Sequence, residues 1–385
     1  MTDLTVEPDE IDIDAELKKD EEFERNEPLD LTGDERRLVT QPYDLSVSSL
    51  VDDIDAGRLL LRMDYQRSYI WDDAKASRLI ESLLLNVPIP VCYFAENEDG
   101  TLEVVDGQQR LQSIWRFISD KVPHEDRLTL RGITVLSEIS GSTFEKLSQR
   151  DQRRVMNRTI RCIVITEDSH ADIKFDVFER LNTGAVRLSD QELRNSIYRG
   201  AFNDLLKETA QYAPFQRALR GQLGSRMEDS ELVLRFVALA DRLTAYKPPL
   251  RQFLNEYMRE HKDDTNTVQP LVRAFREAAE TAESIFGDNA FRRINRAGSA
   301  GRTINKALFD TVMLSLYFAD RAAARERHAE ILAVFPALLD DPDFDALIGR
   351  ATADRARVFG RIVAFSTKLE QIGIATRYRE AVPEA

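Results

Sequence analysis

The feature that most constrains the fold is a change of hydrophobic pattern near residue 209. Before it, short runs of strand composition alternate with short helical patterns. Beyond it, apolar residues recur at helical spacing without a convincing strand, at 229–245, 249–260, 267–286, 303–320, 325–339 and 353–372. A chain of 385 residues exceeds the size at which one core usually stops growing. The pattern predicts an α+β domain at 37–208 followed by an all-helical region at 209–385.

The first 36 residues form a separate acidic segment. They hold 15 acidic and 4 basic side chains, so they contribute −11 to the net charge of −14 and leave −3 for the rest. Such a segment buries too little apolar surface to offset its ordering entropy, which predicts a disordered tail over 1–36. It is interpreted as a solvating tail or, alternatively, as a polyanion mimic that covers a basic surface.

The sequence shows neither a membrane-spanning run nor a secretory signal. No uncharged apolar run is long enough to cross a bilayer, and the N-terminus has acidic residues where a secretory signal needs basic ones. We therefore expect a cytoplasmic protein without membrane contact. Cys92 and Cys162 lie in strand-like apolar runs, where buried structural thiols are expected rather than a disulfide or a zinc site.

Turn and cap residues define the expected elements of the α+β domain. Ser46 is expected to cap a short helix, and a helix over 72–86 should end at Asn86. The runs "IPVCYFAE" and "TLEVV" predict a hairpin through the turn at 97–100. Further strands are expected in "LTLRGITVL" and "RTIRCIVITE", and further helices at 143–154, 171–181 and 189–208.

The stretch "VVDGQQRL" places polar residues where a strand runs into a helix. Asp106 as N-cap and Gln109 at N3 match a capping box, which explains these two residues structurally. Gly107, Gln108 and Arg110 are not explained in this way. A glycine, a helix N-terminus, amides and a guanidinium can cradle an anion, so phosphate binding is the alternative interpretation. The Walker pattern is absent.

A second polar cluster, "YQRSYIW", repeats the amide and guanidinium chemistry. Gln66 and Arg67 stand among the aromatic residues Tyr65, Tyr69 and Trp71, whose rings could pack on the core or stack on a base. The alternative is an arginine held over aromatic rings by a cation–π contact.

A third cluster lies in "FERLNTGAVRLSDQELRNSIYRG". Ser189 and Glu192 match a second capping box, so much of the segment is helix punctuation. The segment also crowds charged and amide groups near one turn, where Asn182 would suit a ribose or a base edge; these groups are Glu179, Arg180, Asn182 and Arg194.

One loop of the helical region, "FRRINRAGSAGRTINK", is rich in basic residues: Arg292, Arg293, Arg296, Arg302 and Lys306. A flexible loop of this kind can contact phosphates, and a solvated surface loop is the alternative.

The stretches "YQRSYIW", "NVPIPVCYF", "VVDGQQRL" and "FERLNTGAVRLSDQELRNSIY", in this order, resemble the N-terminal domain of GmrSD-type restriction enzymes. That domain is the GmrS-like branch of the ParB/sulfiredoxin fold. The resemblance covers about residues 43–205 and, more weakly, parts of the helical region.

The resemblance implies a Mg²⁺-dependent nucleoside triphosphatase that acts in defence against phage or modified foreign DNA. By position, Asp106, Gln108, Gln109, Arg110 and Arg67 would be catalytic. Tyr65, Gln66, Gly107 and Asn182 would bind the nucleotide. Arg67 and Arg110 would balance phosphate charge, Asp106 would hold Mg²⁺ or orient water, and Gln108 or Gln109 would position the attacking water.

The chain departs from relatives that continue into a His-Asn-His nuclease domain. Its C-terminal half offers His261 and His328, both expected on exposed charged helical faces. We therefore expect a separate nuclease subunit, with DNA as a partner and a homo-oligomer as an option for the amphipathic helices. The alternatives are a nucleotide-gated DNA-binding protein with little hydrolysis and a ParB-like nuclease.

Overall fold

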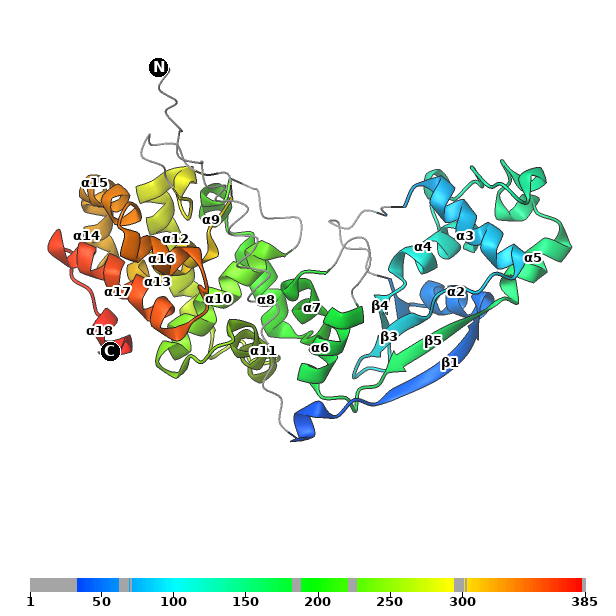
Figure 1. Ribbon diagram of the computed structural model, residues 1–385, viewed down its shortest axis with the longest axis horizontal. Helices are drawn as coiled ribbons and strands as arrows, with labels where there is room; N and C mark the ends of the chain where they lie inside the picture. The colour runs from blue at the N-terminus through cyan, green and yellow to red at the C-terminus, as the bar shows by residue number, and fades with distance from the viewer. Residues whose placement is uncertain are drawn as a thin grey trace, which may run out of the picture. The chain divides into compact units, whose positions relative to one another are not determined.

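The computed structural model describes residues 33–61, 69, 71–181, 188–220, 227–293, 301 and 303–382. Residues 1–32, the expected acidic tail almost entirely, lie outside them. The described residues form two compact units, which divide between Leu188 and Ser189 (Figure 1). We call them the N-terminal unit and the helical unit. The α+β class expected from the sequence is confirmed.

The N-terminal unit is built on a mixed sheet of order β1-β5-β3-β4-β2. Its strands are β1 (Thr40–Ser46), β2 (Leu59–Leu60), β3 (Cys92–Glu96), β4 (Leu102–Asp106) and β5 (Thr159–Ile165). β3 and β4 form the expected antiparallel hairpin. β3 pairs with β5 in parallel, and β1, which the sequence did not reveal, pairs with β5 in antiparallel register.

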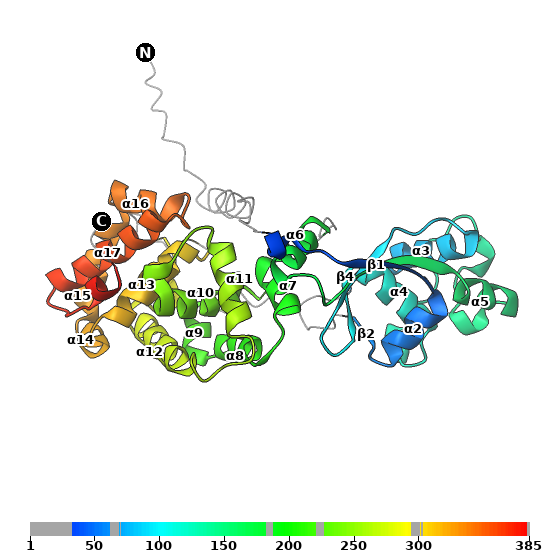
Figure 2. The ribbon, with the colours of Figure 1, turned by 90° about the horizontal axis from the view of Figure 1, so that it is seen from below.

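Figure 2 shows the helices of this unit beside the sheet. These helices are α2 (Val47–Asp55), α3 (Asp73–Leu85), α4 (Gln108–Ile118), α5 (Gln149–Met156) and α6 (Ala171–Leu181), and short 3-10 helices lie at Gly33–Arg36, His124–Asp126, Ser137–Ile139 and Phe144–Lys146. Residues of α2, α3, α4 and α5 share one apolar core with the sheet. Ser46 caps α2, and α3 ends at Asn86, which adopts the left-handed conformation. Both cap predictions are confirmed.

The expected strand "LTLRGITVL" is not a strand. Leu128, Leu130 and Ile133 are buried as the pattern indicated, whereas Val135 is exposed. The backbone, however, bonds to α3 side chains: Ser77 Oγ accepts from the N–H of Arg131, and Glu81 Oε1 accepts from the N–H groups of residues 134–136. Buried backbone donors satisfied by side chains need no neighbouring strand.

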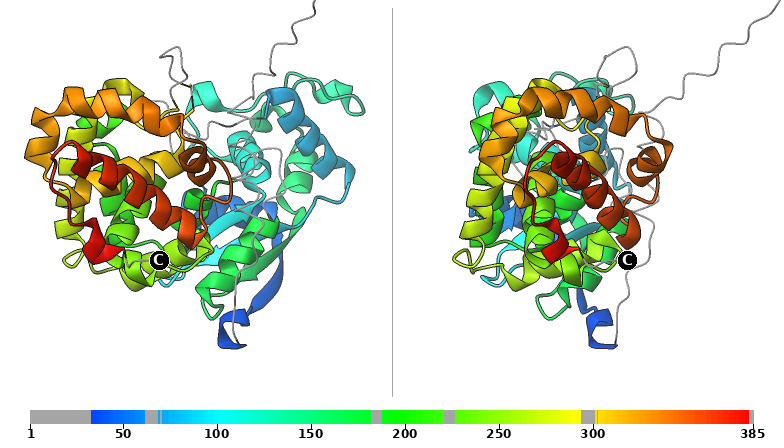
Figure 3. Two further views of the ribbon diagram at one scale, coloured as in Figure 1. Left: turned by 60° about the vertical axis from the view of Figure 1, so that its left-hand side comes forward. Right: turned by 90° about the vertical axis from the view of Figure 1, so that its left-hand side faces the viewer.

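The helical unit begins earlier than residue 209, because its first two helices contact α10. Figure 3 shows this unit from two sides. Its helices are α7 (Asp190–Ile197), α8 (Ala201–Ala210), α9 (Ala213–Ala218), α10 (Glu228–Arg242), α11 (Leu250–Glu260), α12 (Gln269–Phe286), α13 (Lys306–Phe318), α14 (Arg321–Glu326), α15 (His328–Leu339), α16 (Pro342–Gly349), α17 (Arg355–Gln371) and α18 (Tyr378–Ala381), with 3-10 turns at Leu243–Ala245 and Gly287–Asn289. The expected helical segments are confirmed, with 189–208 and 325–339 each divided between two helices.

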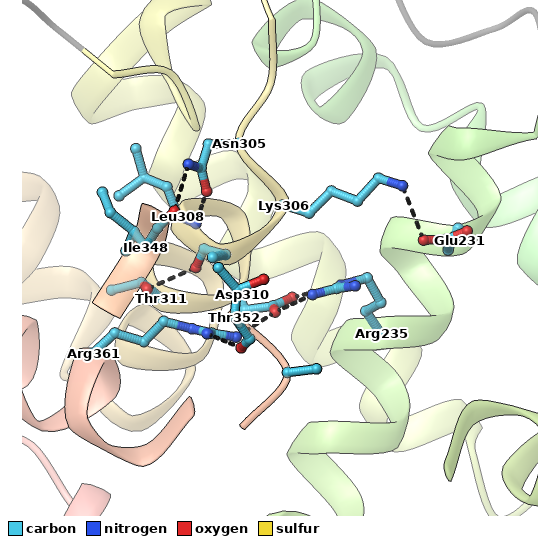
Figure 4. Close-up of polar contacts among 12 residues, drawn as sticks. Glu231, Arg235, Asn305, Lys306, Leu308, Asp310, Thr311, Ile348, Thr352 and Arg361 are labelled. Carbon is cyan, nitrogen blue, oxygen red and sulfur yellow. Dashed lines mark hydrogen bonds and ion pairs between the residues drawn. The ribbon is translucent and has the colours of Figure 1, made fainter. Parts of the chain in front are cut away.

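A buried charge network joins three helices of this unit (Figure 4). Asp310 on α13 accepts from Arg235 on α10 at 3.1 and 2.6 Å, and from Arg361 on α17 at 2.9 Å. One turn earlier on α13 and on α10, Lys306 pairs with Glu231 at 3.2 Å. Burial alone would raise the pKa of Glu231, but the neighbouring cations, Lys306 first, lower this pKa to about 2.

Within the described ranges, no helix combines the length and the apolar character needed to cross a bilayer.

Candidate functional site

The site is a strand–turn–helix unit at the end of β4. Asp106 is the last residue of the strand, Gly107 follows with φ of 103°, and α4 begins at Gln108. The expected capping box is wrong. Gly107 occupies the N-cap position, and no side chain caps the helix. The Asp106 carboxylate instead binds a side chain one turn into α4, because the left-handed glycine moves it away from the helix end.

Arg110 is the partner of Asp106. Its NH2 group donates to Asp106 Oδ2 at 2.5 Å, and its NH1 group donates to the carbonyl of Pro90 at 2.5 Å. The Arg110 side chain is 12% exposed and that of Asp106 32%. A guanidinium has five N–H donors. Two therefore fix its orientation among the described residues, and the remaining donors can serve a ligand.

The turn lies directly on the sulfur of Cys92. A Cβ atom placed on Gly107 would come within 2.6 Å of Cys92 Sγ, which is closer than real contacts allow. Burial raises the pKa of Cys92 to about 11, so the thiol is neutral at pH 7. The expectation of buried structural cysteines is confirmed for Cys92 and for its register partner Cys162, which are both free.

Gly107→Ala is expected to destabilise the turn. The substitution adds a steric overlap with Cys92 to a backbone conformation that L-residues rarely adopt, at a cost of about 1–3 kcal/mol. Urea unfolding of the full chain measures this loss. The matched control is Gly100→Ala, at a φ of 77° with open space around it; an equal loss in both variants would show that the sulfur contact adds nothing.

Two aromatic residues of the second cluster, Tyr69 and Trp71, dock on α4. The Tyr69 hydroxyl lies 2.7 Å from Ser113 Oγ, and the Arg116 guanidinium lies 4.3 Å from the centre of the Tyr69 ring. The N–H of Trp71 donates to Gln109 Oε1 at 3.3 Å. Tyr65, Gln66 and Arg67 themselves lie outside the described residues. Packing of the aromatic residues on the core, one of the two interpretations of this cluster, is confirmed for Tyr69 and Trp71. Their hydrogen-bond partners on α4 were not predicted.

Tyr69→Phe should loosen this docking while keeping the ring under Arg116. Losing one partly buried hydrogen bond costs about 0.5–1.5 kcal/mol, since Ser113 Oγ also donates to the carbonyl of Gln109 at 2.6 Å and is not left unpaired. Urea unfolding measures the loss. The control Tyr43→Phe changes an exposed tyrosine on β1. A larger loss of unfolding free energy in Tyr43→Phe than in Tyr69→Phe would contradict the role given to the Tyr69–Ser113 hydrogen bond.

Arg180 and Arg194 of the third cluster each have partners inside their own unit. Arg180 pairs with Asp176 on its own helix at 2.9 Å. Arg194 is buried in the helical unit, where it donates to Asn255 at 2.9 Å and Gln191 at 3.2 Å. The capping box of Ser189 and Glu192 is confirmed. Asn182 lies outside the described residues.

The basic loop of the helical unit is largely structural where it is described. Arg292 is fully buried and donates to the carbonyls of Ala218, Leu219, Asp288 and Ala290. Arg293 pairs with Asp345 at 2.8 Å, and Lys306 with Glu231 as above. The flexible-loop interpretation is therefore wrong for these three residues, because backbone carbonyls hold Arg292 and carboxylates pair with Arg293 and Lys306. Arg296 and Arg302 lie outside the described residues.

The two histidines of the C-terminal half differ. His328 is exposed as expected. His261 is buried, which corrects the expectation of an exposed position: its ring stacks on Tyr257 with centroids 4.2 Å apart. Among the described residues, no three acidic, histidine or cysteine side chains gather as a metal site.

The resemblance implies Mg²⁺, and Asp106 is the carboxylate expected to bind it. Mg²⁺ is often held by one or two carboxylates together with substrate phosphates, rather than by a cage of protein ligands. The partly exposed Asp106 carboxylate fits this mode, although it already holds Arg110. A metal would therefore depend on bound phosphates.

Fold and site together define the N-terminal unit as an α+β domain with a polar strand–turn–helix site beside a docked aromatic segment. Residues 47–199 match the family model of the GmrSD restriction endonuclease N-terminal domain. This part of the chain, which runs from α2 to α7 and its C-cap, is therefore a domain of that restriction-enzyme family. No curated protein matches the chain.

Proposed function

We propose that the N-terminal unit binds and hydrolyses a nucleoside triphosphate with Mg²⁺, as part of a restriction-type defence system. The observation that carries the proposal is the state of Arg110. Its guanidinium is oriented by Asp106 and Pro90 at the start of α4 and keeps donors for a ligand. An arginine held beside a helix N-terminus favours phosphate, because fixed donors and the helix dipole both attract negative charge.

Each residue of the turn has a proposed role. Arg110, together with Arg67 from the preceding segment, stabilises charge that develops on the transferred phosphoryl group. Gln108 positions the attacking water. Gln109 holds the N–H of Trp71 and so acts as a positioning residue for the docked segment.

The nucleotide is bound by close approach to the turn. Gly107, with a φ of 103°, would let the chain turn into α4 so that the free N–H groups at the helix start can donate to a phosphate. Tyr65 and Gln66 would contact the base or the sugar, and Asn182 a ribose or base edge. Asp106 would hold Mg²⁺ jointly with the phosphates. When bound, this ion would neutralise part of the phosphate charge.

The partners follow from the restriction family. DNA, modified or not, is the proposed target, and a separate polypeptide supplies nuclease activity. A cytoplasmic location and a homo-oligomer built through the amphipathic helices complete the proposal.

Phosphate release from ATP, GTP, CTP and UTP, with and without DNA and with Mg²⁺ or a chelator, tests the proposal. We expect Mg²⁺-dependent release from at least one nucleotide. Tight nucleotide binding without release would favour a nucleotide-gated DNA-binding protein. The absence of both nucleotide binding and phosphate release, with and without DNA, would contradict the proposal.

A further inference from the structure

Helix α5 presents an arginine face to solvent. Arg150, Arg153 and Arg154 stand at positions i, i+3 and i+4, which share one face of a helix. All three are exposed. Among the described residues, none of the three side chains forms an ion pair or hydrogen bond, unlike the basic residues of the 292–306 loop described above.

Local contacts explain why these arginines have no partner within the described ranges. The acidic residue of the helix, Asp151, is held at the N-terminus, where its carboxylate accepts from Ser148 Oγ at 2.6 Å. The Gln152 amide donates to the carbonyls of Phe144 and Leu147 at 3.1 Å each. Val155 is fully buried in the core. The helix is thus fixed on its inner side, and the arginine face is free to meet a partner.

The chemistry of the face favours a polyanion over a protein surface. Protein interfaces use apolar or aromatic anchors at their centre. The exposed side of α5 offers none, since its sequence "QRDQRR" is polar throughout. The helical rise places Arg150 and Arg154 about 6 Å apart along the axis. DNA carries a phosphate about every 3.4 Å of axis per strand, so the three guanidiniums can contact successive phosphates of one strand.

We infer that the face formed by Arg150, Arg153 and Arg154 contacts the phosphate backbone of DNA. The inference rests on the proposed role in restriction and locates its DNA contact. The contact is independent of base sequence, because phosphates carry no sequence information.

The test measures binding of the full chain to a fluorescent DNA duplex at several KCl concentrations between about 50 and 200 mM. Replacing the three arginines by alanine should weaken binding at least about tenfold and reduce the slope of log K against log[KCl] by about 2 to 3. Replacing all three by lysine keeps the charge and should keep most of the slope.

A matched pair of single variants controls for net charge. Arg153→Ala should lower the slope by about 1. Arg273→Ala removes the same charge from an exposed position on α12 and should leave the slope unchanged.

Unchanged binding by the alanine triple, or equal slopes for the two single variants, would overturn the inference. DNA binding that appears only after residues 1–36 are removed would also overturn the inference for the intact chain. That result would indicate that the acidic tail covers the arginine face. Phosphate release measured without DNA reports on the proposed hydrolysis separately, so the two failures are distinguishable.

Discussion

Arg110→Ala should lower nucleotide turnover by about a hundredfold or more, which corresponds to about 3–4 kcal/mol of transition-state stabilisation. The alanine removes a guanidinium that is already oriented, with its NH2 group on Asp106 and its NH1 group on the carbonyl of Pro90. It also leaves the Asp106 carboxylate without its cation. The measurement is steady-state phosphate release, with kcat and KM determined separately.

Arg161→Ala is the matched control. It breaks another arginine–aspartate pair in the same unit, between β5 and Asp44 of β1, where the two side chains are about half exposed. Exposed pairs of this kind contribute about 0–1 kcal/mol to stability, so turnover should stay near that of the wild type. Equal losses of kcat in both variants, or no loss for Arg110→Ala with the fold intact, would remove Arg110 from the catalytic site.

Asp310→Ala should reduce the free energy of unfolding by about 3–5 kcal/mol, because it leaves the buried cations Arg235 and Arg361 uncompensated. The carboxylate and both guanidiniums are at most 3% exposed, so water cannot take its place without opening the core. Urea unfolding, followed by circular dichroism, measures the loss.

Asp204→Ala is the control for Asp310→Ala. It removes the same charge from an exposed position on α8, where the described partner is Lys207 at 3.2 Å, and should change stability by less than about 0.5 kcal/mol. A second variant replaces Asp310, Arg235 and Arg361 together by apolar residues of similar size, and should recover much of the stability. A loss below about 1 kcal/mol for Asp310→Ala would show that the network is not a structural anchor.

Local chemistry was enough to predict the elements whose signals are local. Asn86 and Ser46 act as caps because their short polar side chains suit the ends of helices. The β3–β4 hairpin follows from two apolar runs around a turn. The long helices of the C-terminal half follow from apolar periodicity, which packing against neighbours preserves.

The predictions that were wrong concern residues whose structure depends on contacts between distant segments. Strand composition at 128–136 was overridden because α3 satisfies that backbone with Ser77 and Glu81. Arg292 and His261 have charged neighbours in sequence, yet the fold buries both.

The candidate site shows the same division. The sequence identified the polar turn from Asp106 to Arg110 but assigned Asp106 to the wrong partner, because an N-cap and an i,i+4 arginine compete for one carboxylate. The docking of Tyr69 and Trp71 on α4 joins segments about 40 residues apart and has no local signal.

The central claim is that the turn from Asp106 to Arg110 binds a triphosphate. A crystal structure of the full chain with a non-hydrolysable nucleotide and Mg²⁺ tests it most directly. The account predicts a phosphate oxygen within hydrogen-bond distance of the Arg110 guanidinium. A nucleotide bound elsewhere, with Arg110 still engaged only by Asp106 and Pro90, would contradict it.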